Sequence, residues 1–354
     1  MPDGLAASPR LLMTTDAVGG VWRYSLDLTE GMGARPVLAV LGPSPSAAQR
    51  DEAAGLGLTL IDTGLPLDWT ADDPAALNEA TAALQDLAAE RRVASVHLHA
   101  PALAGAWRWP MPVVAVAHSC VATWWEAVRG GPLPADLAWR TEATRTGLRT
   151  ADAVVAPTRA HGDAVRRLYG DVPVTVVHNG TRQPLGLARA QAAPSVLTAG
   201  RLWDDGKNAA ALDRVAPRLG VPVRAAGPIE GPHGARIDLP NLQHLGTLGP
   251  DGMGRAFAEA TVFASLARYE PFGLSVLEAA RAGLRLVLSD IPSFRELWDG
   301  VARFVPDGSD PVPALRAALA DTGDGGAAER AGHYGVAAMV EGTLAVHRRV
   351  GARV

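Results

Sequence analysis

Lysine occurs once in this chain, at Lys207, and the other 32 of its 33 lysine and arginine residues are arginines. A single lysine in such a composition suggests a site where a compact ammonium cannot be exchanged for a planar guanidinium. Phosphate is a common partner of such a flexible point charge. Lys207 shares a loop with Arg201, directly after the apolar run Val196–Ala199. The two cations could neutralise a diphosphate without a metal ion, whereas a lysine that survived by chance would have no such role.

The loop around this lysine differs from a Walker A phosphate-binding loop. Five residues, rather than four, separate Gly200 from Gly206, and Asn208 stands where a serine or threonine would hold magnesium. Asp204 and Asp205 would oppose an anion if they pointed toward it, so both are expected to face solvent. The loop therefore predicts phosphate binding by side-chain cations alone.

Two glutamates, Glu270 and Glu278, frame a second segment, 269–280. A run of good helix formers occupies 275–282, after a proline and a glycine that break the chain. The first N–H groups of a helix have no intrahelical partner, so those over 273–276 would favour a phosphate. Carboxylates accept hydrogen bonds from vicinal hydroxyls, and two of them suggest a ligand with two diols, such as a sugar and a ribose. The alternative is one capping and one solvated glutamate.

Two loops in the first half of the chain carry weaker signals. Gly19 and Gly20 follow the strand-like run 11–14, where their backbone could approach an anion closely, although they do not complete a dinucleotide-binding fingerprint. His118 follows the run 113–117 and could hydrogen-bond a substrate hydroxyl or a developing charge. A tight turn and a structural histidine are the alternatives.

Other histidines and tryptophans are candidates for binding rather than chemistry. His97 and His99 alternate along the run 95–98 and should share one face of a strand, but no cysteine or carboxylate stands at ligand spacing, so zinc is not expected. Trp124 and Trp125 follow the His118 loop. Aromatic faces suit sugar rings or lipid chains, which makes these two residues candidates for an acceptor site, with core packing as the alternative.

Length and composition bound the class of protein. A chain of 354 residues predicts two domains. The net charge of −4 gives no general reason to bind nucleic acid, and any membrane contact would have to be local and peripheral. One cysteine and the lack of a signal-like or spanning segment favour a cytoplasmic protein, at most peripheral to the inner face of the membrane.

Short apolar runs alternate with longer helix-like segments, which is typical of parallel sheets covered on both faces. The predicted strands are 11–14, 37–41, 58–61, 95–98, 113–117, 153–156, 174–177, 196–199, 221–225, 262–264, 286–288 and 303–305.

The pattern predicts an α/β protein with two doubly wound, Rossmann-like domains. The first domain is 1–180, a linker covers 181–194, the second domain is 181–330, and 331–354 forms a helix that docks back toward the first domain. Ligands of such sheets lie beyond the carboxyl ends of the strands, so a central cleft between two facing domains is the expected site.

Together these motifs resemble the retaining nucleotide-sugar glycosyltransferases of family 4, which have the GT-B fold. The E-x7-E spacing of Glu270 and Glu278 within EPFGLSVLEA carries most of the resemblance. The other matching segments are the Gly19-Gly20 loop, VVAVAHS at 113–119, ADAVVAPT at 151–158, VVHNGT at 176–181, GRL and GKN within 200–208, LGTL at 245–248, and LSDIPSFREL at 288–297.

The resemblance implies roles for the candidate residues. Arg201 and Lys207 would hold the donor diphosphate, Glu270 the transferred sugar and Glu278 the ribose. His118 would contact the donor sugar near the reacting carbon. The catalytic set implied is therefore His118, Glu270, Arg201 and Lys207. The other donor contacts implied are Gly19, Gly20, Phe272, Gly273 and Leu274.

The resemblance also implies a reaction. A sugar would pass from a nucleoside-diphosphate sugar to a hydroxyl of a glycan, a lipid-linked glycan or a small molecule, as in polysaccharide biosynthesis. The configuration would be retained by front-face departure, with no metal or other cofactor. Breaking a sugar–phosphate bond develops negative charge on the diphosphate, and the cations of the Lys207 loop are suited to that charge.

Three alternatives share parts of this pattern. A pyridoxal-dependent sugar phosphorylase needs a lysine for its Schiff base, and the one lysine already stands on the diphosphate loop. A nucleotide-sugar epimerase on the same fold is the second alternative. A non-catalytic nucleotide-sugar-binding subunit is the third, and it would not need His118 or Glu270.

Overall fold

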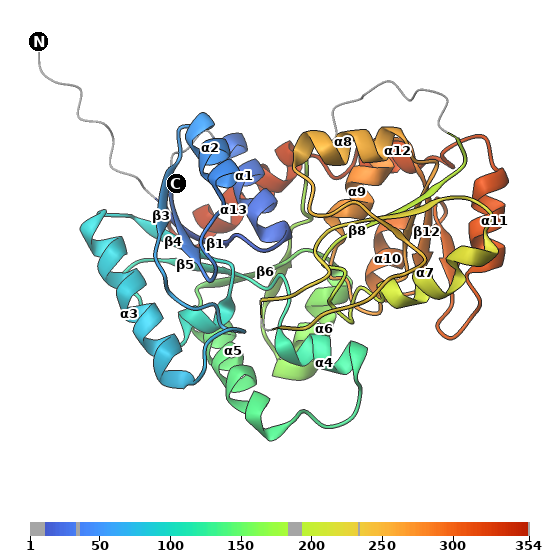
Figure 1. The fold of residues 1–354 in the computed structure, drawn as a ribbon. Coiled ribbons are helices and arrows are strands. Elements are labelled where there is room, and N and C mark those ends of the chain that lie inside the picture. The colour runs from blue at the N-terminus through green and yellow to red at the C-terminus, as the bar shows by residue number, and fades with distance from the viewer. Residues whose placement is uncertain (1–10, 33–35, 183–192, 233, 353–354) are drawn as a thin grey trace, which may run out of the picture. The chain divides into compact units, whose positions relative to one another are not determined.

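The computed structural model describes residues 11–32, 36–182, 193–232 and 234–352 (Figure 1). The chain divides into two compact units, here called unit 1 (Met1–His178 with Val336–Val354) and unit 2 (Asn179–Gly335). Most of the predicted linker 181–194 lies outside the described residues. Each unit is an α/β domain built on one parallel sheet.

The sheet of unit 1 has seven parallel strands in the order β3-β2-β1-β4-β5-β6-β7. Nearly every residue of its central strands is buried because helices cover both faces. The strands are β1 Leu11–Asp16, β2 Val37–Leu41, β3 Thr59–Asp62, β4 Ser95–Leu98, β5 Val113–Val116, β6 Ala153–Ala156 and β7 Val174–Val176.

Alternate residues of β1 face opposite layers of helices in unit 1. Leu12 packs into a core with α3, whereas Leu11 and Met13 pack into a core with α1, α2 and α13. Side-chain caps begin several helices, for example the Asp73 carboxylate, which accepts the Ala76 N–H at 2.9 Å at the start of α3. The helices are α1 Gly20–Met32, α2 Ala47–Gly55, α3 Pro74–Glu90, α4 Val121–Val128, α5 Ala138–Thr150, α6 Arg159–Tyr169 and α13 Val336–Arg349.

The sheet of unit 2 has six parallel strands in the order β10-β9-β8-β11-β12-β13. Helices α8, α9, α10 and α12 cover one face, and α7 and α11 the other. The strands are β8 Val196–Ala199, β9 Val223–Ala226, β10 Gln243–His244, β11 Val262–Ser265, β12 Arg285–Ser289 and β13 Arg303–Val305. The helices are α7 Ala209–Val215, α8 Pro250–Ala258, α9 Leu274–Arg281, α10 Pro292–Trp298, α11 Val312–Ala320 and α12 Ala327–Ala331.

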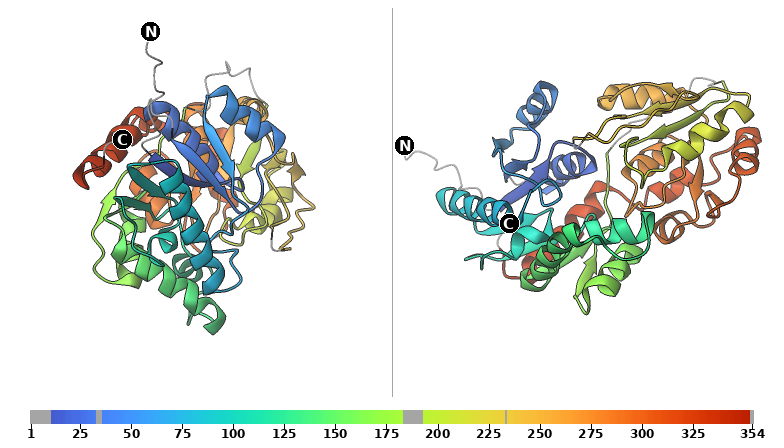
Figure 2. Two further views of the ribbon diagram at one scale, coloured as in Figure 1. Left: turned by 90° about the vertical axis from the view of Figure 1, so that its left-hand side faces the viewer. Right: turned by 60° about the horizontal axis from the view of Figure 1, so that its bottom comes forward.

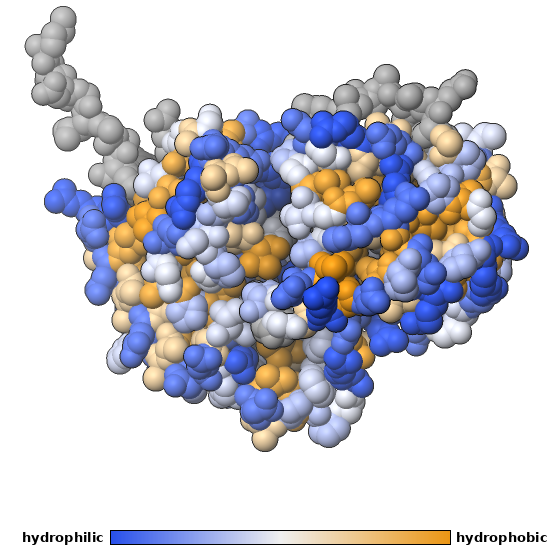
Figure 3. All heavy atoms as spheres, in the orientation of Figure 1, coloured by the Kyte–Doolittle hydropathy of each residue, from blue (hydrophilic) through white to orange (hydrophobic). Residues whose placement is uncertain are grey.

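All twelve predicted strands are present, which confirms the predicted fold class of two parallel α/β domains. The short edge strand β10 was not predicted, because its two residues are polar and exposed and give no apolar run. Polar and apolar side chains are interspersed on the face seen in Figure 3. Within the described part of the chain, no helix is both long and apolar enough to cross a membrane.

Helix α13 completes unit 1, although the whole of unit 2 separates it from the rest of that unit in sequence. It lies beside α1, as the red and blue helices in Figures 1 and 2 show. Val340 packs closely on Gly31 of α1, where a Cβ atom would lie within 2.5 Å of a Val340 methyl group. At the other end, Val346 packs against Val177. The helix is therefore part of the unit 1 core.

Gly147 is the position in unit 1 where substitution should disturb packing most directly. It lies inside α5, where a Cβ atom would overlap the backbone carbonyl of Pro101 in the short helical turn Pro101–Ala104. Alanine normally stabilises a helix relative to glycine, but here the overlap forces the two segments apart. We expect Gly147→Ala to lower the free energy of unfolding by about 3 kcal/mol in urea denaturation.

The matched control for this prediction is Gly55→Ala, at the end of α2, where a Cβ atom would meet nothing within 4 Å. This variant should unfold at the wild-type urea concentration or slightly above it. Equal stabilities of the two variants would show that the close approach of α5 to Pro101 does not matter.

Candidate functional site

Two loops follow the adjacent strands β8 and β11 of unit 2 and are hydrogen-bonded to each other. The loop after β8 covers 200–208, and the loop after β11 covers 266–273. The Gly206 carbonyl accepts N–H groups of Arg268 at 2.9 Å and Tyr269 at 3.2 Å. Since both strands are parallel, both loops lie at the carboxyl edge of the sheet, where ligands of such sheets bind.

This bridge brings Lys207 and Glu270 together in an ion pair. Their side chains are 22% and 12% exposed, so the pair is only partly accessible to solvent. The next residue, Asn208, has a left-handed backbone (φ 53°) and donates from its amide to the Leu266 carbonyl at 2.9 Å. The Ser293 hydroxyl of α10 donates to the Glu270 carbonyl. Both partners are therefore held on anchored backbone.

The guanidinium of Arg201 is held by Asp204, which corrects the prediction for that aspartate. Asp204 was expected to face solvent, but its side chain is 8% exposed and lies 3.0 Å from Arg201 Nη2. Its other oxygen accepts the Gly206 N–H at 2.8 Å, so burial is compensated by hydrogen bonds. Asp205 is exposed, as predicted. No sequence pattern indicated that the Asp204 side chain is buried and holds the loop together.

Glycines let the backbone segments after β8 and β9 approach closely. Gly200 and Gly227 have φ of 150° and 129°, and a Cβ atom at Gly227 would overlap the Gly200 carbonyl. The Gly227 N–H donates to the Gly246 carbonyl at 2.8 Å, which joins the segment after β10. Main-chain groups therefore form a large part of this edge of the sheet.

Helix α9 begins beside Glu270. Gly273 is left-handed (φ 89°), and its carbonyl accepts the N–H groups of Val276 and Leu277 at 3.0 and 3.1 Å. The hydrogen bonds within the helix start at this carbonyl. The N–H of Leu274, at the amino end, therefore has no acceptor within the helix. Glu278 lies about one turn further, half-buried.

Phe272 was predicted as a donor-binding residue, and the structure limits what it can contribute. Its side chain is buried in the hydrophobic core of unit 2 and meets the ring of Tyr334 edge-on at 5.9 Å. Only its backbone therefore lies among the predicted donor-binding residues that start α9.

Unit 1 holds the other predicted residues at the carboxyl edge of its own sheet. Gly19 and Gly20 follow β1, and Gly20 is the first residue of α1. The loop is tied by the Asp16 carboxylate, which accepts the Val18 N–H at 2.8 Å. His118 follows β5, half-buried. Each of these positions remains a prediction as a donor contact.

His118 is hydrogen-bonded to a second histidine that the sequence did not link to it. Its Nε2 lies 2.8 Å from Nδ1 of His99, and His99 Nε2 lies 3.2 Å from the Ser25 hydroxyl. The ring of Tyr24 meets the His118 ring edge-on at 4.7 Å. Burial lowers the pKa of His118 to about 3 and holds the pKa of His99 well below its usual value. Both rings are neutral at pH 7.

A second histidine pair lies deeper in unit 1. His97 and His99 share one face of the sheet, as predicted, with ring centroids 4.9 Å apart. His97 Nδ1 is 3.1 Å from Nε2 of His347 in α13. Neither His97 nor His347 is accessible to solvent. Within the described residues, no group of three or more histidine, cysteine or acidic side chains could hold a metal ion.

The predicted acceptor tryptophans lie on α4, directly after the His118 loop. Trp124 and Trp125 are half-buried, with ring centroids 6.4 Å apart. The guanidinium of Arg129 lies over the Trp124 ring, 5.4 Å from its centroid. Their part in acceptor binding remains a prediction.

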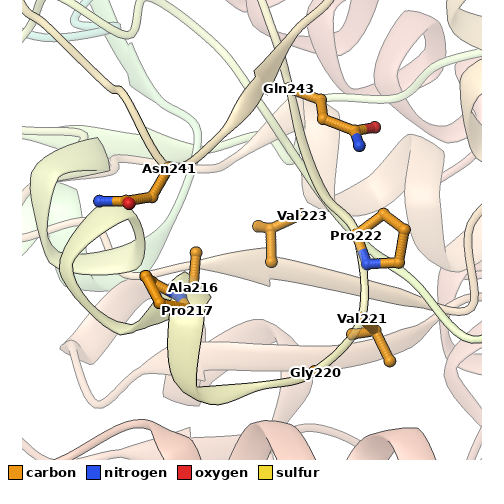
Figure 4. Close-up of a pocket in the computed structure, with 8 residues that line it drawn as sticks. All are labelled: Ala216, Pro217, Gly220, Val221, Pro222, Val223, Asn241 and Gln243. Atoms are coloured by element: carbon orange, nitrogen blue, oxygen red, sulfur yellow. The ribbon is translucent and has the colours of Figure 1, made fainter.

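A surface cavity of about 500 Å³ lies at the opposite edge of the unit 2 sheet (Figure 4). Its lining comes from the residues that lead into β9 and β10, whereas the Lys207 loop follows the carboxyl end of β8. The cavity therefore lies away from the predicted donor residues. It is lined by Ala216, Pro217, Gly220, Val221, Pro222, Val223, Asn241 and Gln243.

Two glycosyltransferase family models match the chain, one in each half. Residues 18–182 match the model "Glycosyltransferase Family 4", and residues 193–322 match "Glycosyl transferases group 1". No curated protein sequence matches the chain.

Solved structures with low sequence identity share the fold over almost the whole chain. Sucrose-phosphate synthase from Thermosynechococcus elongatus is 17% identical with a TM-score of 0.75, covering 97% of this chain and 100% of the other. HepE from Anabaena, in complex with UDP and glucose, is 14% identical with a TM-score of 0.72, covering 96% and 99%. A glycosyltransferase from Rickettsia africae is 13% identical with a TM-score of 0.68, covering 97% and 99%.

Proposed function

Because the chain belongs to the glycosyltransferases of the GT-B fold, we propose that it transfers a sugar from a nucleoside-diphosphate sugar to an acceptor hydroxyl. The anomeric configuration is retained and no metal is needed. The observation that carries this proposal is the arrangement of Lys207, Arg201 and Glu270 beside the amino end of α9. The UDP and glucose bound in the structurally similar HepE support a nucleotide-sugar donor.

The donor diphosphate binds to the loop after β8. Lys207 turns its ammonium from Glu270 toward the phosphate oxygens, and Arg201 adds the guanidinium that Asp204 holds in place. Negative charge grows on the diphosphate as the sugar–phosphate bond breaks, and fixed cations stabilise that state more than the ground state. N–H groups at the start of α9 add to this field. The two side chains can therefore do the work of a metal ion.

The two glutamates hold the ends of the donor. Glu270, which pairs with Lys207 in the absence of donor, accepts hydrogen bonds from hydroxyls of the transferred sugar. Glu278, about one turn into α9, accepts the ribose hydroxyls. Glu270 acts here as a binding group and forms no bond to the sugar.

The acceptor hydroxyl attacks from the face that the leaving phosphate vacates. The departing phosphate oxygen takes the acceptor proton, so no protein base is required. His118 is neutral, with a pKa of about 3, and serves as a hydrogen-bond partner of the sugar rather than as a general acid. The acceptor is a glycan, a lipid-linked glycan or a small molecule, and Trp124 and Trp125 are the surfaces on which its rings stack.

Calorimetric titration of the protein with UDP, GDP, ADP and TDP in the presence of EDTA tests the donor site. One of the four should bind, and Lys207→Ala and Glu278→Ala should each weaken that binding about tenfold or more. The matched control is Asp205→Ala, which removes an exposed carboxylate from the same loop and should not weaken binding. Binding of none of the four nucleotides by folded protein would contradict the proposed function.

A further inference from the structure

A row of hydrogen-bonding side chains runs from the core of unit 1 to His118. It begins at Ser25 of α1, which is fully buried and whose hydroxyl lies 2.8 Å from the Val21 carbonyl, 3.0 Å from Thr15 Oγ1 and 3.2 Å from His99 Nε2. It continues from His99 Nδ1 to His118 Nε2 over 2.8 Å. The Ser25 hydroxyl and each neutral imidazole carry only one hydrogen that can be donated. The donor and the acceptor of each hydrogen bond in the row can therefore be assigned.

The Val21 carbonyl fixes the direction of the row because a carbonyl can only accept. The Ser25 hydroxyl has one hydrogen, and its shortest contact directs that hydrogen to Val21. Ser25 Oγ must then accept from His99 Nε2–H. A neutral imidazole carries one proton, so His99 Nδ1 is an acceptor and takes the Nε2–H of His118. The Nδ1 atom of His118 is left with a lone pair.

This lone pair is open to a ligand. Among the described residues, none is hydrogen-bonded to His118 Nδ1, and that atom is not one of the buried polar atoms that lack a partner. The side chain as a whole is half-buried. The backbone of His99 is also fixed, because its N–H donates to Thr14 Oγ1 at 2.9 Å. A hydroxyl that approaches His118 finds an acceptor in a defined direction.

We propose that Ser25 and His99 are positioning residues that hold His118 as its Nε2–H tautomer, with Nδ1 presented as an acceptor to a hydroxyl of the donor sugar. The inference rests on the proposed function for the identity of that ligand. It adds a specificity element, because a donor sugar that cannot donate a hydrogen bond there leaves the Nδ1 lone pair unsatisfied. Sugars with a free hydroxyl at that position are therefore preferred.

The tautomer can be measured without substrate, by long-range nitrogen–proton NMR of protein labelled with ¹⁵N-histidine. We expect His118 in the Nε2–H form at pH 7. Ser25→Ala removes the acceptor of His99 Nε2–H and should populate the Nδ1–H form of His118. The matched control is Thr81→Val, which removes another buried hydroxyl that donates to a carbonyl one helical turn earlier, in α3. It should leave the His118 signals unchanged.

Substitutions at His99 separate positioning from simple packing. His99→Leu keeps bulk but offers no acceptor, whereas the side-chain oxygen of His99→Asn can stand where Nδ1 stood. With UDP-glucose as donor, His99→Leu and Ser25→Ala should lower kcat/KM about tenfold, the size of one hydrogen bond, and His99→Asn should restore most of it. Binding of UDP, which carries no sugar, should stay within twofold of wild type.

The outcomes distinguish this inference from the proposed function. An Nδ1–H tautomer of His118 in the wild type, or a tautomer that Ser25→Ala leaves unchanged, would overturn the inference even if UDP binds and sugar is transferred. Failure of both UDP and UDP-glucose to bind would count against the use of a uridine donor, and the NMR result would still decide the tautomer. Equal losses of kcat/KM in His99→Leu and His99→Asn would show that His99 contributes packing alone and does not orient His118.

Discussion

Lys207→Arg should lower kcat about a hundredfold although the positive charge is kept. The stem of Lys207 runs along Gly200, and its ammonium ends on Glu270, whose side chain is 12% exposed. A planar, longer guanidinium cannot take the same position beside both Glu270 and a diphosphate. Lys207→Ala, which also removes the charge, should lower kcat about a thousandfold.

Steady-state rates of sugar transfer and calorimetric binding of the nucleoside diphosphate together test this prediction. The Kd should change less than kcat, because the charge on the diphosphate grows as the sugar leaves. Asp205→Asn is the matched control on the same loop, and its exposed side chain should leave kcat near the wild-type value. Near-normal turnover by Lys207→Arg would show that the single lysine has no special role.

Acid should unfold unit 1 before unit 2. Burial lowers the pKa of His118 to about 3 and that of His161 and His347 to about 4, whereas the unfolded value is about 6.5. The folded state therefore binds fewer protons. This contribution to stability is complete above pH 6.5 and is lost as the pH falls toward the folded pKa values. At pH 4.5 the cost is roughly 2–3 kcal/mol for each of these histidines, and several together approach the stability of a domain.

Unit 2 has no buried histidine among its described residues, since His244 and His333 are both exposed. Hydrogen exchange measured by mass spectrometry between pH 7 and pH 4 should show amide protection lost first in unit 1. His347→Gln removes one buried titrating group and should lower the midpoint pH of that loss. His333→Gln should leave it unchanged. Earlier loss of protection in unit 2 would contradict the prediction.

The fold could be predicted because the strands of parallel sheets contain near-continuous apolar runs. The run 286–288 located β12, and only its polar ends, Arg285 and Ser289, were missed. The edge strand β10 was missed because it pairs through backbone with β9 alone and buries no side chain. The hydrophobic pattern of a sequence indicates which residues are buried, so a strand whose side chains are exposed cannot be recognised from it.

The site could be predicted only in part. The predicted ends of two strands were enough to place Lys207 and Glu270 at one edge of a sheet. Their ion pair, however, depends on the register of β8 with β11 and on the hydrogen bonds to the Gly206 carbonyl. Alternation placed His97 and His99 on one face. The hydrogen bond between His97 and His347 joins residues 250 positions apart, and a single sequence contains no signal that predicts a contact between such distant residues.

The chain path has a consequence for how the protein forms during synthesis. The sheet of unit 1 is complete in the nascent chain by Val176, but the helix that covers it, α13, begins only at Val336. Between the two events a ribosome makes all of unit 2, which takes roughly ten to thirty seconds. During that time Gly31 lacks Val340 and His97 lacks His347, so apolar and polar surface of the first unit stays uncovered. The part of the protein that is synthesised first is therefore completed last.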